Sequence, residues 1–208
     1  MDTKTNKYYS ILALTLGDGY LQFSHNNKQG KAYLDIAHKP ECEDYINYKA
    51  KILTELGIQN TIELKKKQNG THQSRVWTKY YQIIGDVKRT LYKNNNKIFK
   101  KRFIKNLDDW ALAILWMDDG CTYIQKKKKV DGSIYYYQCG DIATQSFSYQ
   151  SQLNILQWLQ TFDIKGNLQV SKGKYHIHLN RQNVCKLIKI VAPYVKEVPS
   201  MHYKIKII

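Results

Sequence analysis

The sequence is short of acidic side chains and of long apolar runs, and both shortages limit what the protein can do. Only 17 aspartates and glutamates oppose 33 lysines and arginines, so the formal net charge at pH 7 is +16. No apolar run approaches the roughly 18 residues that a membrane-spanning helix needs. The basic residues do not line one face of an amphipathic helix either, which argues against a membrane surface as partner. The charge therefore favours a polyanion, with nucleic acid as the first candidate.

Cysteine is also scarce, and its four positions form no pattern. The spacings contain no C-x-x-C motif and no paired framework, so neither a zinc site nor a disulfide scaffold is expected. The first residues, MDTKTNKYYS, show neither a secretory signal nor a transit pattern. We therefore expect an intracellular protein with reduced thiols. Heavy use of Lys, Asn, Ile and Tyr fits an A+T-rich genome, such as that of an organelle or a phage. The cysteines are Cys42, Cys121, Cys139 and Cys185.

What the sequence does contain is an internal repeat. Two apolar stretches end in Asp-Gly, ILALTLGDGY at 11–20 and LAILWMDDGC at 112–121. An Asp-Ile-Ala tripeptide follows each stretch, at 35–37 and at 141–143. Helical and alternating patterns then follow in the same order and at matching intervals in both halves. A duplication is therefore the best explanation of the chain.

Each repeat is predicted to contain a helix, two strands, a second helix, two further strands and a third helix. The N-terminal repeat covers 1–100 and the C-terminal repeat 101–208, with no linker rich in Pro, Gly or Ser between them. We therefore predict an α+β fold made of a pseudo-symmetric αββαββα pair. The expected helices cover about 8–16, 45–56, 83–92, 110–117, 153–162 and 184–194, and the alternating strands lie at Ile62/Leu64, Val76/Thr78, Leu168/Val170 and Ile177/Leu179, with turns at Asn69-Gly70 and near Gly173.

The two motif helices carry acidic residues at an unfavourable end. Both apolar stretches are apolar on nearly every side, which is typical of helices that are buried all round. Asp18 and Asp119 stand at the C-terminal ends of these helices, where the negative end of the helix dipole repels a carboxylate. Asp108 and Asp109, by contrast, precede the second motif helix, where acidic side chains cap free N–H groups.

Two interpretations of Asp18 and Asp119 are open. They are exposed turn residues beside Gly19 and Gly120, which suit a left-handed helix cap, or they meet at the symmetry axis and hold a divalent cation. Because the same unfavourable arrangement occurs twice, we prefer the second interpretation. Carboxylate oxygens suit Mg²⁺ together with substrate phosphate oxygens, which points to a phosphodiester. Such an ion generates hydroxide and stabilises the charge that develops during hydrolysis.

At these residues the sequence resembles the LAGLIDADG homing endonucleases, in particular the single-chain, intron-encoded type with two motif copies. In ILALTLGDG and LAILWMDDG the eighth position is aspartate and the ninth is glycine, as in the family pattern. The similarity extends to IATQSFSYQ at 142–150 and VPSMHYKIK at 198–206. The resemblance implies that each half lays a saddle-shaped antiparallel sheet into the DNA major groove, and that the halves pack through two central motif helices.

The resemblance also implies an activity and its partners. The expected reaction is hydrolysis of both DNA strands across the minor groove, leaving short 3′ overhangs, with Mg²⁺ or Mn²⁺ as cofactor. The expected partner is double-stranded DNA with a long specific target, bound by a monomer with internal pseudo-two-fold symmetry. Two alternatives are a maturase of the same fold that binds intron RNA, and a catalytically inactive DNA-binding descendant. Intact Asp18 and Asp119 argue against the inactive descendant but do not exclude a maturase.

The family places one basic residue per half near the scissile phosphate. Lys97 and Lys204 are the matching candidates, and they stand at nearly the same interval after Ile58 and Ile164 in the two repeats. The alternative is that both are ordinary surface lysines.

Two further positions are assigned by the resemblance. Gln145 resembles a family glutamine that orders water, whereas Lys39 stands at the repeat-related position, so the two cleavage centres are predicted to be unequal. The seventh motif position is Gly17 in the first copy and Asp118 in the second, and the main chain there helps to hold metal in the family. Asp118 is alternatively structural. The predicted metal ligands are Asp18, Asp119, Gly17 and Asp118, and the predicted catalytic residues are Asp18, Asp119, Lys97, Lys204 and Gln145.

Alternation along the strands predicts the face that meets DNA. It puts Ile62, Leu64, Ile177 and Leu179 inward and leaves Glu63, Lys65, Lys67, His176, His178 and Asn180 on the other face. The alternative is that any half-exposed sheet has a polar outer face, and that the lysine run 126–129 is only a solvated hairpin tip. A metal pair at His176 and His178 lacks a third ligand nearby. The predicted DNA contacts are Gln22, Lys65, Lys67, Arg75, Lys79, Lys126, Lys128, Tyr135, Tyr137, His176 and His178.

Overall fold

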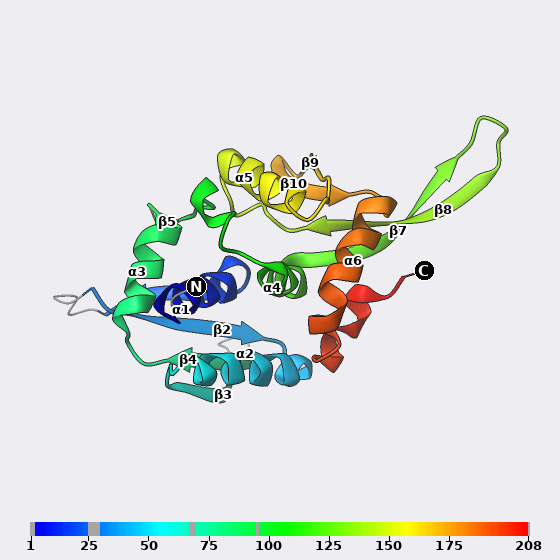
Figure 1. Ribbon diagram of the computed structural model, residues 1–208. Coiled ribbons are helices and arrows are strands. Elements are labelled where there is room, and N and C mark those ends of the chain that lie inside the picture. The colour runs from blue at the N-terminus through cyan, green and yellow to red at the C-terminus, as the bar shows by residue number, and fades with distance from the viewer. Residues whose placement is uncertain (1–2, 25–29, 67–69, 95, 208) are drawn as a thin grey trace. The chain divides into compact units, whose positions relative to one another are not determined.

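The computed structural model describes residues 3–24, 30–66, 70–94 and 96–207 (Figure 1). The chain forms two compact units, one of Met1–Asn95 with Glu197–Met201 and one of Asn96–Lys196 with His202–Ile208. Each unit holds a four-stranded antiparallel sheet with helices packed on it. The predicted α+β class is therefore confirmed, and so is the order of helix, two strands, helix, two strands and helix in each half.

The first unit opens with the motif helix α1 (Thr3–Leu16). Its strands are ordered β1-β2-β4-β3, and α2 packs on β2, β3 and β4 while α3 packs on β1 and β2. Gly57, with φ of +66°, closes α2 because Ile58 N donates to the Leu53 carbonyl oxygen at 2.8 Å. The remaining elements are β1 (Tyr20–Phe23), β2 (Ala32–His38), η1 (Pro40–Cys42), α2 (Glu43–Glu55), β3 (Asn60–Lys66), β4 (His72–Thr78), α3 (Gln82–Leu91) and β5 (Tyr92–Lys93).

The second unit repeats this topology, with its strands ordered β7-β8-β10-β9. Helix α5 packs on β10, and α6 packs on β8 and β10 and also on the motif helix α4. The hairpin of β7 and β8 extends well beyond the other two strands of its sheet (Figure 1). The elements are β6 (Asn96–Lys97), η2 (Lys101–Phe103), α4 (Asp109–Asp119), β7 (Gly120–Lys128), β8 (Ile134–Ile142), α5 (Tyr149–Gln160), β9 (Asn167–Ser171), β10 (Lys174–Leu179), α6 (Arg181–Val195) and η3 (Pro199–Ile205).

Side-chain caps explain where three helices of the second unit begin. The Asp108 carboxylate accepts from Ala111 N at 3.0 Å, which confirms the predicted cap of α4. Ser148 and Asn180 accept in the same way from Ser151 N and Asn183 N. Such caps stabilise a helix by about 1 kcal/mol each, so they help to set where each helix begins.

The C-terminal part of α1 and the middle of α4 are buried on all sides, as their composition predicts. In α1 the run Ile11–Leu14 is fully buried, and in α4 every residue from Ala111 to Met117 is at most 1% exposed. Burying each large side chain contributes roughly 1.5–3 kcal/mol, so each of these helices adds substantially to the stability of its own unit. Thr15 is the polar exception in α1, and its hydroxyl is satisfied because it donates to the Ile11 carbonyl oxygen at 2.7 Å.

Candidate catalytic centres and nucleic-acid interface

The chain turns sharply after each motif helix, and glycine permits the turn. A Cβ atom on Gly19 would lie 2.4 Å from the Leu14 carbonyl oxygen, and one on Gly120 would lie 2.2 Å from Cε3 of Trp116. Neither glycine is among those with positive φ, and φ of Gly120 is −82°. The left-handed cap considered from sequence is therefore wrong at both positions. These glycines let the strand fold back tightly against its own helix, which directs the preceding aspartates to the helix tip.

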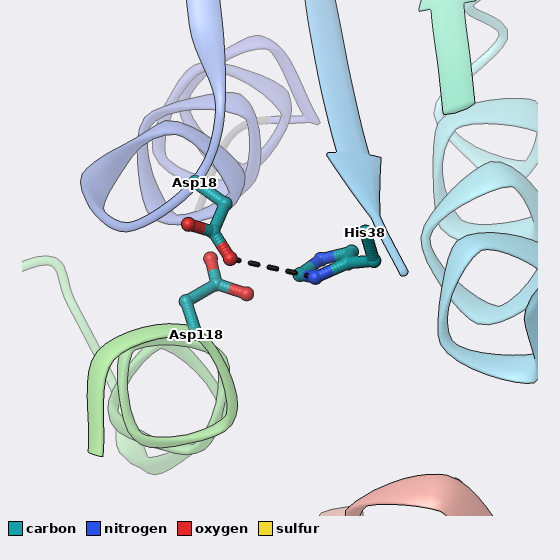
Figure 2. Close-up of side chains that lie close together, drawn as sticks. All are labelled: Asp18, His38 and Asp118. Carbon is teal, nitrogen blue, oxygen red and sulfur yellow. Dashed lines mark ion pairs between the residues drawn. The ribbon is translucent and has the colours of Figure 1, made fainter. Parts of the chain in front are cut away.

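In the first unit, Asp18 lies just beyond α1 and faces a histidine of β2. Asp18 Oδ2 is 3.4 Å from His38 Nδ1, and the Asp18 side chain is 40% exposed whereas that of His38 is 10% exposed (Figure 2). On its other side, His38 Nε2 lies 3.1 Å from Nζ of Lys49 in α2. The carboxylate is thus open to solvent and is oriented from behind by a nearly buried imidazole.

In the second unit, the last turn of α4 is capped by a buried lysine. Lys204 Nζ donates to the carbonyl oxygens of Trp116 and Asp118, each at 3.3 Å, and to that of Met117. In return, Trp116 Nε1 donates to the Lys204 carbonyl oxygen at 3.0 Å. A cation at a helix C-terminus offsets the negative dipole end, which lowers the cost of ending this helix on Asp119. The main chain of Asp119 is held as well, because Ala143 N donates to its carbonyl oxygen at 2.8 Å.

Replacing Lys204 by methionine tests this cap. The variant removes the three donations to α4 while keeping a side chain of similar length, and we expect the free energy of unfolding to fall by about 2 kcal/mol. Urea unfolding followed by circular dichroism measures the change. Lys206→Met is the matched control, since Lys206 is exposed and contributes only its main-chain oxygen, which accepts from Gln138. Equal stability of the two variants would contradict the cap.

The other predicted catalytic residues lie at different depths. Lys97 ends β6 and is half-buried, whereas Gln145 and its repeat-related Lys39 are both exposed. Gly17, Asp118 and Asp119 are half-buried. At these corresponding positions the second half therefore presents an amide to solvent, and the first half presents an ammonium group.

The polar face of the first sheet is organised around Arg75 in β4. Its guanidinium donates to both carboxylate oxygens of Asp35 at 2.6 Å and to Glu63 at 2.8 Å. The Asp35 carboxylate therefore raises the pKa of Arg75 even above its ordinary value. Cross-strand pairing places Arg75 on the same face as Glu63 and Ala37. Arg75 is thus held rigidly on the face predicted to meet DNA.

The second sheet carries a different cluster at the equivalent place. Asp141 accepts from the Tyr123 hydroxyl at 3.1 Å, and it lies 2.9 Å from Nδ1 of His178 and 3.6 Å from Nε2 of His176. Burial, together with the Asp141 carboxylate, raises the pKa of Tyr123. Asp35 and Asp141 occupy corresponding repeat positions, so the duplication has kept the acid and changed its basic partners. His176 and His178 are each only 8% exposed, which is less open than predicted.

Strand register corrects part of the predicted DNA-binding face. Ile62 pairs with Val76 and Leu64 with Ser74, so both share the inward face as expected. They are nevertheless 42% and 64% exposed, because they lie on the edge strand β3, whereas Ile177 and Leu179 are buried as predicted.

The lysines of the β7–β8 hairpin also need correction. Lys127 pairs with Tyr135 and Gln125 with Tyr137, so alternation puts Lys126 and Lys128 on the opposite face from the two tyrosines. Of the other predicted DNA contacts, Gln22 accepts from the Tyr33 hydroxyl at 2.9 Å, Lys65 and Lys79 are exposed, and Lys67 lies outside the described residues.

The four cysteines are free thiols. Among the described residues, no helix combines the length and the apolar character needed to cross a membrane.

Sequence reasoning missed His38 and Lys49. His38 directly follows the repeated Asp-Ile-Ala element, where the second half has Thr144, and this difference between the repeats was the available signal. Lys49 looks like a solvated residue of an amphipathic helix in sequence, yet it is fully buried. Only the packing of α2 on its sheet brings it to His38.

Fold and site together define a duplicated α+β protein in which each motif helix delivers one aspartate at its C-terminal tip. The sequence profile of the LAGLIDADG DNA endonuclease family matches residues 10–187. The chain therefore belongs to this family, as the motif resemblance indicated.

Curated relatives include proteins of two kinds. The cytochrome b mRNA maturase bI2 of Saccharomyces cerevisiae is 28% identical over 208 residues, which cover 94% of this chain and 46% of the relative. A RecA protein of Mycobacterium shimoidei is 23% identical over 204 residues, covering 96% of this chain and 46% of the relative. The chain thus spans less than half the length of these relatives.

Solved structures show the same fold. The homing endonuclease I-WcaI bound to its DNA recognition sequence matches with a TM-score of 0.76 and 20% identity, covering 98% of this chain and 87% of that chain. A variant of I-DmoI in complex with its target DNA in the presence of manganese matches with a TM-score of 0.53 and 12% identity, covering 92% of this chain and 96% of that chain. The fold is accordingly that of LAGLIDADG homing endonucleases.

Proposed function

We propose that this protein is a site-specific endonuclease that hydrolyses both strands of a long double-stranded DNA target with a divalent metal ion. The observation that carries the proposal is the pair of aspartates, Asp18 and Asp119, each delivered to the tip of a motif helix by a tight glycine turn. Family membership and the DNA-bound structural neighbours agree with it. The net charge of +16 supplies the attraction to a phosphate backbone.

The donor groups fit Mg²⁺ or Mn²⁺. Asp18 offers a carboxylate that is 40% exposed, so a cation that keeps several waters has room beside it. Asp119 and the main chain of Gly17 and Asp118 offer further oxygen atoms, the ligand type that these ions prefer. In this proposal Asp18 and Gly17 are metal ligands in the first half, and Asp119 and Asp118 are metal ligands in the second. When bound, the ion supplies Lewis acidity and a hydroxide at neutral pH.

The remaining residues orient the reaction. Lys204 acts mainly by fixing the last turn of α4 and hence Asp119, because its ammonium group is committed to three main-chain oxygens. Lys97 is proposed to serve the phosphate directly. Gln145 orders water in one half, where the other half has Lys39, and this chemical difference predicts that one strand is cut before the other.

A cleavage selection tests the proposal. A randomised DNA library is incubated with the protein in Mg²⁺, and the cut molecules are sequenced. We expect recovery of one long target with breaks in both strands, and binding of that target without cleavage when Ca²⁺ replaces Mg²⁺. If the protein enriches no cut sequence while remaining folded, the endonuclease proposal is wrong.

The similarity to the cytochrome b mRNA maturase supports a second candidate, assistance of intron splicing. That activity would require binding to a folded intron RNA and no hydrolysis of DNA, so the two activities can be assayed separately. Splicing of candidate introns with and without the protein distinguishes the two. Intact Asp18 and Asp119 argue against the third possibility, an inactive DNA-binding descendant. An intracellular, organellar origin stays an expectation from residue usage.

A further inference from the structure

Three side chains of the first unit form a line that ends at Asp18. Lys49 Nζ lies 3.1 Å from Nε2 of His38, and Nδ1 of the same ring lies 3.4 Å from Asp18 Oδ2. Figure 2 shows the imidazole at the end of β2 with its Nδ1 edge turned toward the carboxylate. The line therefore runs from the buried Lys49 of α2 to Asp18 at the C-terminal tip of α1.

Lys49 is an unusual residue for this place. Its side chain is fully buried, and Nζ stands 4.2 Å from the centroid of the Tyr45 ring. Burying an ammonium group costs free energy because the group loses its water. The Tyr45 ring face and the His38 imidazole nitrogen both help to offset this loss. The Tyr45 and His38 rings are themselves in contact, with centroids 4.8 Å apart. This packing fixes the direction in which Lys49 donates.

We propose that His38 and Lys49 are positioning residues for Asp18. An ammonium group has only donors, so Nε2 of His38 accepts from Lys49 and the single ring proton of neutral His38 stands on Nδ1. That N–H points to Asp18 and holds its Oδ2 atom, 3.4 Å away, in the orientation in which the carboxylate meets the metal. The effect on catalysis rests on the proposed function, whereas the position of the ring proton and its contact with Asp18 do not.

The second half has no such line among its described residues at the repeat-related positions. Thr144 replaces His38, and its hydroxyl donates to Gln152 Oε1 at 3.1 Å. Gln152 Nε2 donates in turn to the carbonyl oxygens of Phe147 and Tyr175. A network of uncharged groups thus stands where the first half has a line that joins an ammonium group to a carboxylate. Positioning by a histidine and a buried lysine is therefore specific to Asp18.

The first test reads the His38 tautomer by long-range proton–nitrogen NMR correlation in the protein without metal or DNA. We expect the proton on Nδ1 in the wild type and a loss of that preference in Lys49→Met. Lys51→Met is the matched control, because Lys51 lies in the same helix but is exposed. A wild-type His38 protonated on Nε2 would overturn the inference, whether or not the protein cuts DNA.

The second test measures single-turnover cleavage of each strand of the selected target. We expect His38→Ala to slow cleavage of at least one strand by about 10- to 100-fold, with unchanged DNA affinity in Ca²⁺. His38→Asn should recover part of the rate, since its amide N–H stands near the place of Nδ1–H. Wild-type rates on both strands in His38→Ala would refute the inference. Failure of the wild type to cut would instead refute the proposed function, and the NMR result would still decide the tautomer.

Discussion

Replacement of Asp18 or Asp119 by asparagine is expected to abolish double-strand cleavage and to leave DNA binding nearly intact. Asparagine keeps the shape of the side chain but removes the negative charge that a divalent ion requires. If the ion contributes about 4 kcal/mol to stabilising the transition state, the cleavage rate falls roughly a thousand-fold. Single-turnover cleavage in Mg²⁺ and binding in Ca²⁺ measure the two effects separately.

Asp108→Asn is the matched control for this experiment. It makes the same chemical change at the opposite end of α4, where Asp108 caps the helix. Asparagine is as good an N-cap as aspartate, so stability and cleavage should both stay close to wild type. Full cleavage by Asp18→Asn or Asp119→Asn would remove these residues from the metal site.

Gly120→Ala is expected to destabilise the fold strongly. The added Cβ would overlap the Trp116 ring at 2.2 Å and would lie 2.6 Å from the Trp116 main-chain oxygen. Trp116 is fully buried, so neither group has room to move without disturbing the core. We expect the free energy of unfolding to fall by about 3 kcal/mol, measured by denaturant unfolding.

Gly70→Ala separates overlap from backbone strain. Gly70 has φ of +84°, and nothing lies within 4 Å of its added Cβ. Its replacement should therefore cost only about 1 kcal/mol, from the left-handed conformation alone. If Gly120→Ala proved no more damaging than Gly70→Ala, the tight turn would not be what requires glycine after the motif.

Local patterns in the sequence were enough to predict the duplication and the order of elements. Hydrophobic periodicity is set by nearest neighbours along a helix or strand, and the Asp108 cap is a contact within one turn. The role of Gly120 was misjudged because glycine serves both left-handed caps and close approaches, and only the position of the Trp116 ring distinguishes them. A local pattern therefore identified the residue but not the reason for it.

The candidate site was predicted less completely, for reasons of tertiary packing. The contact of Lys49 with His38 depends on how α2 crosses its sheet, which periodicity does not encode. Lys126 and Lys128 were grouped with Tyr135 and Tyr137, but the strand register puts the two pairs on opposite faces, because a difference of one residue reverses every side chain of a strand. Exposure of Leu64 followed from its place on an edge strand, which the sequence does not specify.

The returning tail of the chain limits how the protein can be divided. Glu197–Met201 belongs to the first unit although it lies near the end of the second repeat. There Ser200 N donates to Asp44 Oδ2 at 2.8 Å, and Val198 and Met201 are buried. A fragment cut at the junction of the repeats would leave that carboxylate and that apolar surface without their partners. In a chimera that exchanges whole halves between related proteins, the five residues Glu197–Met201 should therefore come from the same parent as the N-terminal half.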